Sequence, residues 1–120
     1  MQSNLFRRVD AIVKSGVMEA ASDVADLLSM NDEAMDANLI GYRREDGCLI
    51  IESVSRMEEH SVGKCMSSTY GGVEPTEGMI SMMDVYPDGI LMVIDPYACE
   101  IRFYRNTEDG LADARVLVSE

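Results

Sequence analysis

The sequence is poor in the residues that usually hold metal ions. It has one histidine (His60) and three cysteines, Cys48, Cys65 and Cys99. The cysteines are odd in number and far apart in the chain, which argues against a disulfide framework. A structural zinc site needs clustered pairs of cysteine and histidine, and the sequence contains none. We therefore expect no metal and no cofactor, and we expect the cysteines to act as small buried hydrophobic residues.

Basic residues are also scarce. Ten lysines and arginines stand against 22 aspartates and glutamates, which gives a formal net charge of −12. Such a charge repels phosphate groups, so nucleic acids and anionic membranes are disfavoured as partners. No apolar run is long enough to span a membrane, and the N-terminus lacks the apolar core of a signal peptide. We expect a cytoplasmic protein whose acidity serves solubility or a basic partner.

The length and composition predict one folded domain over residues 1–120, because an apolar content of 47% suits a globular protein. Near the N-terminus, apolar residues recur at the helical period. This pattern predicts one bent helix or two short ones over residues 4–29, with Ser3 or Asn4 as the N-cap. We expect this helical segment to cover the core and to carry no chemistry.

The remaining pattern alternates strands with one further helix. The predicted elements are a hairpin at 38–42 and 48–54 around an Asp-Gly turn, a strand at 62–66, a helix from Thr76 to Tyr86, strands at 90–94 and 101–104, and a last strand at 115–118. The predicted fold class is α/β (α+β): a single mixed β-sheet with an N-terminal helical segment and a central helix.

Several short motifs follow one another in the second half of the chain. They are Val62-Gly63, the loop containing Gly71-Gly72, Pro75-Thr76, Tyr86-Pro87, Val93-Ile94-Asp95-Pro96 and Phe103-Tyr104. In this order and spacing, the segment resembles the C-terminal half of JAB/MPN domains, the fold of the JAMM zinc isopeptidases. Upstream, Leu39-Ile40-Gly41 is similar to the Leu-Leu-Gly strand of that family. The resemblance implies a JAB/MPN-like fold with its site at the Gly-rich loop.

The resemblance also implies a zinc site from which this sequence departs. Met66 and Ser68 stand where the family has its two histidine ligands, and Met79 stands where it has an aspartate. The catalytic glutamate has only Glu33 or Asp36 as candidates. A methionine thioether is a poor ligand for zinc, so the resemblance implies a degenerate, metal-free relative, that is, a pseudoenzyme.

The function predicted from these features is non-catalytic binding, as a protein-binding scaffold or regulatory subunit with a protein partner or a second copy of the chain. The candidate binding residues lie on the loop and at the start of the second helix: Met66, Ser67, Ser68, Thr69, Tyr70, Gly71, Gly72 and Met79.

Two alternatives remain open at this stage. The chain could be a small cytoplasmic enzyme in which Cys65 is the nucleophile and the backbone of the adjacent Ser/Gly loop stabilises an oxyanion. Its base would be His60 or a carboxylate, Asp84 or Asp95, although a regular strand would point His60 away from Cys65. The other alternative is a roadblock-type or profilin-like interaction domain. An unpaired strand at 115–118, or the hairpin, would allow self-association in any of these cases.

Overall fold

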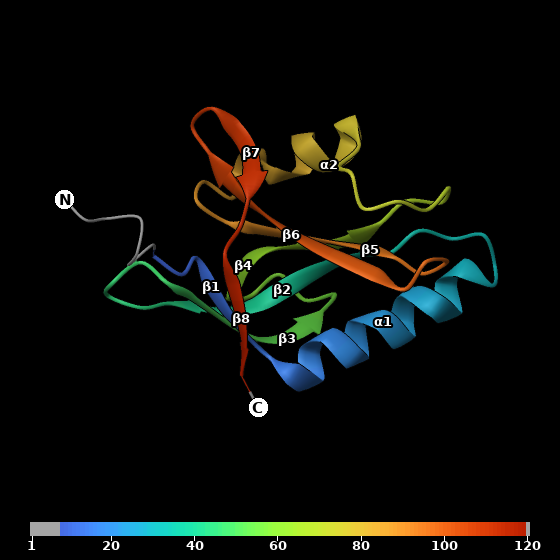
Figure 1. Ribbon diagram of the computed structural model, residues 1–120, viewed down its shortest axis with the longest axis horizontal. Coiled ribbons are helices and arrows are strands. Elements are labelled where there is room, and N and C mark those ends of the chain that lie inside the picture. The colour runs from blue at the N-terminus through green and yellow to red at the C-terminus, as the bar shows by residue number, and fades with distance from the viewer. Residues whose placement is uncertain (1–7, 120) are drawn as a thin grey trace.

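A mixed sheet of eight strands organises the described part of the protein, residues 8–119 of a computed structural model (Figure 1). The strand order across the sheet is β7-β6-β5-β4-β2-β3-β1-β8. The strands are β1 (Ala11–Lys14), β2 (Asp36–Arg43), β3 (Leu49–Ser55), β4 (Ser61–Ser67), β5 (Ile90–Asp95), β6 (Glu100–Thr107), β7 (Gly110–Asp113) and β8 (Val116–Ser119). The helices are α1 (Ser15–Ser29) and α2 (Glu77–Met82), and α2 continues into a 3₁₀ turn, η2 (Met83–Val85). The predicted fold class is confirmed.

The predicted N-terminal helix is correct only from Ser15 onward. Ala11 to Lys14 form β1 instead, which lies between β3 and β8 and pairs with both in parallel. Two partner strands supply more backbone hydrogen bonds and packing than a helical turn would, and this outweighs the local helical pattern. The expected N-cap at Ser3 or Asn4 lies outside the described residues.

The central hairpin is confirmed. β2 and β3 are antiparallel, and Gly47 closes the turn between them at a φ of 88°, a conformation that favours glycine. β2 also pairs with β4, and β4 pairs in parallel with β5. The strands β4, β5 and β6 follow the predicted positions, and β8 lies at a sheet edge as expected. The short strand β7 was not predicted.

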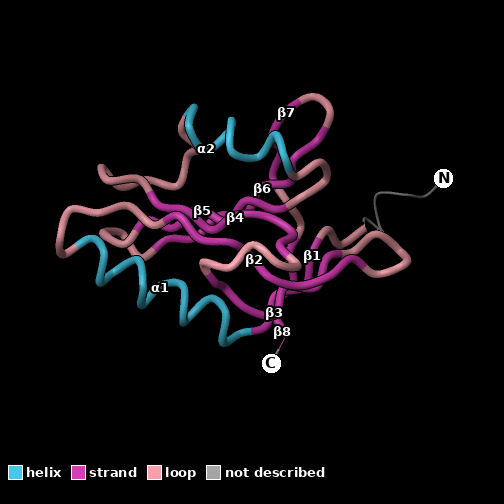
Figure 2. The backbone as a smooth tube through the Cα atoms, turned by 180° about the vertical axis from the view of Figure 1, so that it is seen from behind, coloured by secondary structure: helices cyan, strands magenta, loops and turns pink. Residues whose placement is uncertain are grey.

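One face of the sheet is covered by α1 (Figure 2). The helix buries its small residues Val17, Ala21 and Ala25 against side chains of the central strands, among them Ile90 and Met92 of β5. The small side chains allow the helix to lie close to the sheet, so this face forms the larger part of the core.

The other face carries α2 and the smaller part of the core. Met79 and Met83 pack there against Leu91 and Val93 of β5 and against Tyr104 of β6. Every residue of β5 is buried, and the wholly apolar run Ile90–Ile94 suits a strand that is covered on both faces. Neither helix in residues 8–119 is long and apolar enough to cross a membrane.

Candidate functional site

A hollow of about 360 Å³ opens where the loop after β4 meets the start of α2. Six of the predicted binding residues line it: Met66, Ser67, Ser68, Thr69, Tyr70 and Met79. Gly71 and Gly72 were also predicted but are not among its lining residues. The loop is therefore not packed shut by its own side chains, and the Tyr70 side chain is 97% exposed at the rim.

The second wall of the hollow comes from the loop that precedes β2. Ala34, Met35 and Asp36 line it, and the sequence had suggested only Asp36 among them, as a candidate for a catalytic carboxylate. This wall is tied to the end of β4, because the Met35 N–H donates to the Ser67 hydroxyl at 2.7 Å and the Ser67 N–H donates to the Met35 carbonyl at 3.1 Å. Ser67 is buried and links the end of β4 to the loop before β2, so its hydroxyl has a structural role.

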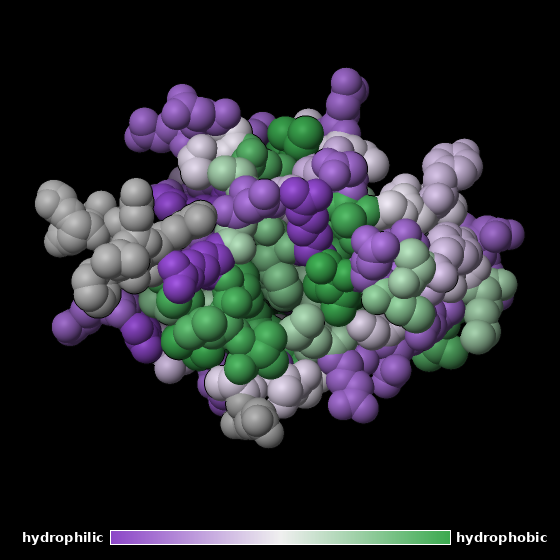
Figure 3. Space-filling view, viewed as in Figure 1, coloured by the Kyte–Doolittle hydropathy of each residue, from purple (hydrophilic) through white to green (hydrophobic). Residues whose placement is uncertain are grey.

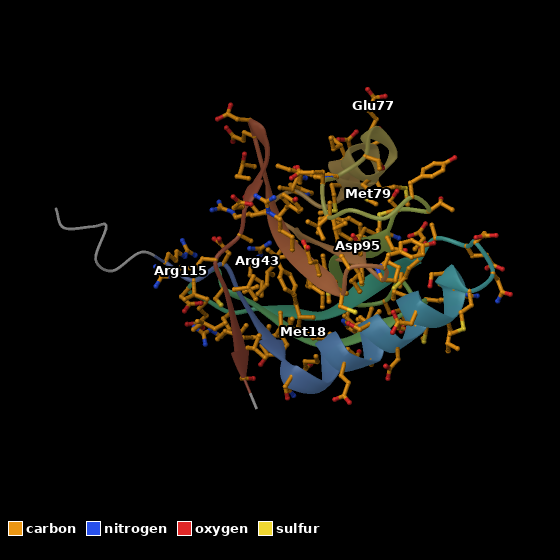
Figure 4. The ribbon with its side chains drawn as sticks, turned by 45° about the vertical axis from the view of Figure 1, so that its right-hand side comes forward. Met18, Arg43, Glu77, Met79, Asp95 and Arg115 are labelled. Carbon is orange, nitrogen blue, oxygen red and sulfur yellow. The ribbon has the colours of Figure 1, made fainter. Side chains whose placement is uncertain are left out.

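The floor of the hollow is formed at the start of α2. The Thr76 hydroxyl accepts a hydrogen bond from the Met79 N–H at 3.2 Å and caps the helix, a role for which threonine is preferred at this position. This cap fixes the first turn, and Met79 then points down between α2 and the sheet while Glu77 points away (Figure 4). Met66 packs against the same cluster from β4. The floor is therefore apolar and built of thioethers.

Asp95 at the end of β5 lies next to the Gly71-Gly72 segment of the loop and fixes the turn that follows β5. Its carboxylate accepts hydrogen bonds from the backbone N–H groups of Tyr97 at 2.9 Å and Ala98 at 3.2 Å. The nearby backbone N–H of Gly72 contributes most to holding the pKa of Asp95 below its usual value, and the N–H groups of Ala98 and Tyr97 add to this effect. The positive φ of Gly71 (82°) and Gly72 (89°) allows this approach. Asp95 is thus a loop anchor and is not available as a base.

A buried polar cluster lies beside the hollow on the same face of the sheet. Lys64 of β4 is only 7% exposed, and its ammonium contacts Asp36 at 2.5 Å and the amide oxygen of Asn38 at 3.2 Å. The Tyr86 hydroxyl donates to the same Asn38 oxygen at 3.4 Å and accepts from the Ser61 hydroxyl at 3.0 Å. Asp36 therefore faces the hollow with its charge already paired from beneath by Lys64.

Cys65 is not placed to act as a nucleophile. Its side chain is fully buried on the α1 face of the sheet, where Sγ lies 3.9 Å from the Met35 Sδ. Burial raises the pKa of Cys65 to about 12, so the thiolate is absent at neutral pH. His60 is exposed before the first residue of β4 and lies about 20 Å from the hollow, since a strand rises ~3.3 Å per residue. The alternative of a cysteine-based enzyme does not fit this geometry.

The donor atoms around the hollow do not suit zinc. Within residues 8–119, no three side chains of His, Cys, Asp or Glu lie close enough together to hold a metal ion. The lining offers thioethers, hydroxyls and the one carboxylate of Asp36. A catalytic zinc ion is held by three imidazole, thiolate or carboxylate ligands that converge on one point, and this lining does not provide them.

Comparisons with known proteins give a clear result only at the level of structure. No protein-family model matches the sequence, and no curated protein matches it either. Among solved structures, the JAB1/MPN domain protein AF2198 from Archaeoglobus fulgidus superimposes with a TM-score of 0.71 at 12% identity, covering 92% of this chain and 97% of that one. The fold is that of the JAB1/MPN domain.

Two further structures agree with this assignment. A protein from a study of JAMM as a metalloprotease-like zinc site in the proteasome and signalosome superimposes with a TM-score of 0.69 at 13% identity, covering 92% of this chain and 98% of that one. The protein DSY2949 from Desulfitobacterium hafniense also superimposes with a TM-score of 0.69 at 13% identity, and the match covers 92% of this chain and 93% of that one. The JAB/MPN-like fold expected from the motifs is confirmed over nearly the whole chain, and the roadblock or profilin alternative is wrong.

Proposed function

We propose that this JAB/MPN-like domain acts by binding a protein partner at the hollow, as a scaffold or regulatory subunit, and has no zinc-dependent hydrolase activity. The observation that carries the proposal is the hollow itself, which is open and has an apolar floor of Met66 and Met79. The single carboxylate in its lining, Asp36, is already paired with Lys64. An apolar hollow of this kind suits a side chain of a partner better than it suits a metal ion.

The charges around the hollow favour a positively charged partner. Its two walls, residues 30–36 and 67–79, contain five acidic residues and neither lysine nor arginine. All five are exposed: Asp32, Glu33, Asp36, Glu74 and Glu77. Asp36 pairs with Lys64 and Glu74 pairs with Arg102 at 3.0 Å, so the other three carboxylates supply the charge that would attract a cation. A cationic peptide segment that inserts one aliphatic side chain between Met66 and Met79 would satisfy both the apolar floor and the acidic rim.

The three cysteines are free, in keeping with the cytoplasmic location that we propose for this activity.

The proposal is tested by peptide titration followed through backbone amide NMR shifts. The probes are three short synthetic peptides: lysines flanking a central leucine, the same peptide with glutamine for lysine, and the same peptide with serine for leucine. We expect the first peptide to shift amides in residues 34–36 and 66–79, and we expect each replacement to weaken binding about tenfold or more. Binding should also weaken as salt is raised, since exposed charges are screened beyond about 10 Å at 0.1 M.

Two variants of equal charge locate the binding. Thr69→Arg places a cation in the lining of the hollow, and Ser81→Arg places the same cation on the exposed surface of α2, outside the lining. Thr69→Arg should abolish the shifts, and Ser81→Arg should leave them within about twofold. Equal losses in both variants would mean that only net charge matters, and shifts elsewhere in the sheet would remove the hollow from the account.

A further inference from the structure

The strand β8 forms one edge of the sheet and carries little that would prevent it from pairing. It bonds only to β1, and its outer edge has no partner strand within residues 8–119. Leu117 and Val118 are 50% and 51% exposed, on opposite faces of the strand. An apolar area is visible where β8 crosses the front of the molecule (Figure 3). Natural sheets usually protect such an edge with lysine, proline or a bulge, and residues 116–119 contain none of these.

The other edge of the sheet is different. The strand β7 begins with Gly110 and ends with Asp113, and Glu108 and Asp109 lie in the turn before it. Asp113 is held in an ion pair with Arg102 at 2.9 Å. Two β7 edges brought together would place acidic side chains close to one another, and like charges across a strand pair destabilise it.

The backbone of β8 presents its free groups at alternate residues. The carbonyl of Arg115 accepts hydrogen bonds from the N–H groups of Asp10 and Ala11, so Arg115 directs its polar groups toward β1. Because these groups alternate in direction along a strand, Val116 and Val118 direct their N–H and C=O groups outward. These two residues provide four groups that are ready to bond to another strand.

The sequence of β8 makes a second copy of the same strand a fitting partner. Residues 116–118 read Val-Leu-Val, which is the same in both directions. If two copies pair antiparallel about a two-fold axis at Leu117, Val116 of each copy lies opposite Val118 of the other. Every apolar side chain then meets an apolar side chain on both faces. The outward groups of Val116 and Val118 form four hydrogen bonds, and Arg115 lies opposite the uncharged Ser119.

We propose that β8 is the contact through which two copies of this chain associate, so that the two sheets continue into each other. The inference is independent of the hollow, which lies at the start of β2 and the end of β4 and is separated from β8 by β3 and β1 in the strand order. The pairing covers only a few residues on each copy and falls in the size range of weak interfaces, so the dissociation constant of the dimer should be in the low micromolar range or higher. Both copies then keep their hollows accessible.

The first test is sedimentation velocity of the 120-residue chain over a wide concentration range. We expect the weight-average mass to rise from monomer toward dimer as concentration increases. Leu117→Lys should keep the chain monomeric, and so should Val118→Pro, which removes an outward N–H without breaking a bond to β1. Ala112→Lys on the exposed surface of β7 is the matched control and should leave association unchanged. A wild-type chain that stays monomeric throughout, or association that survives both β8 variants, would overturn the proposal.

The second test examines the register. In a Cys99→Ser background, which removes the exposed thiol, Leu117→Cys should form an intermolecular disulfide rapidly. The two positions would lie about 4.5 Å apart between Cα atoms across the axis, which is within disulfide range. Ala112→Cys in the same background is the control. We expect crosslinking to be about tenfold faster at position 117 than at position 112, and equal rates would contradict pairing through β8.

Discussion

The ion pair between Asp36 and Lys64 offers the most informative single perturbation, since it joins the wall of the hollow to the buried polar cluster. In the native protein the Lys64 ammonium has two acceptors, Asp36 at 2.5 Å and Asn38 at 3.2 Å. Asp36→Ala leaves a nearly buried cation with one neutral acceptor. Removing one partner of a fully buried pair costs about 3–5 kcal/mol.

The cost here should be smaller, because the two side chains differ in exposure. The side chain of Lys64 is 9% exposed and that of Asp36 is 52% exposed, so water can reach the ammonium once the carboxylate is gone. We expect Asp36→Ala to lower the free energy of unfolding by about 1–2 kcal/mol. A loss of this size corresponds to a fall in Tm of about 4–8 °C for a domain of this length.

The converse change should cost less. Lys64→Met keeps the apolar stem and removes the buried charge, while Asp36 remains solvated and Asn38 keeps the hydrogen bond from Tyr86. The double variant should be as stable as Lys64→Met alone, which gives a coupling energy of about 1 kcal/mol or more in a double-mutant cycle. Urea unfolding of the four proteins measures it. The reasoning is refuted if Asp36→Ala leaves stability unchanged, or if Lys64→Met is the more damaging of the two.

Three further predictions follow from single contacts. Thr76→Ala removes the cap of α2 and should lower the free energy of unfolding by about 1 kcal/mol, seen as a lower urea midpoint, whereas an unchanged midpoint would mean that the cap contributes nothing. Iodoacetamide at neutral pH should label Cys99 in the native protein. Cys48 and Cys65 should react only after unfolding, because burial raises the pKa of both thiols. Mass spectrometry locates the labels, and labelling of Cys65 in the native protein would contradict its burial. The folded-state pKa of Asp95 is lowered, so its stabilisation is present above the ordinary pKa of about 3.9 and is lost as pH falls through the folded value. Asp95→Asn should therefore flatten the fall of the urea midpoint below about pH 4, and a profile parallel to wild type would rule out this role.

Much of the fold could be predicted from the sequence because local signals and tertiary contacts agree. The Asp-Gly turn, the Thr76 cap and the wholly apolar run of β5 each specify their own element. β1 was predicted as helix because its few apolar residues fit either period. Only its pairing with β3 and β8, which lie far away in the chain, determines that it is a strand.

The candidate site could be predicted only on one side. The residues of the β4–α2 loop are contiguous and rich in small and polar side chains, so they stood out. The opposite wall at Ala34–Asp36 has no such pattern, and the Ser67 hydroxyl that joins the walls bonds to a residue 32 positions earlier in the chain. In the sequence, Tyr86 marked the end of a helix and belonged to the Tyr86-Pro87 motif, but nothing indicated that its hydroxyl joins Ser61 to Asn38. Contacts of this range follow from the sheet order, which a single sequence does not specify.

The central claim, that a JAB/MPN-like fold binds a partner here without zinc chemistry, is tested most directly by titrating Zn²⁺ into metal-free protein and following backbone amide shifts. The account predicts no saturable shift in residues 34–36 or 66–79, while the lysine-flanked leucine peptide still shifts these residues in the presence of zinc. Saturation at one equivalent of zinc, with the shifts concentrated around Asp36, Met66 and Met79, would contradict it.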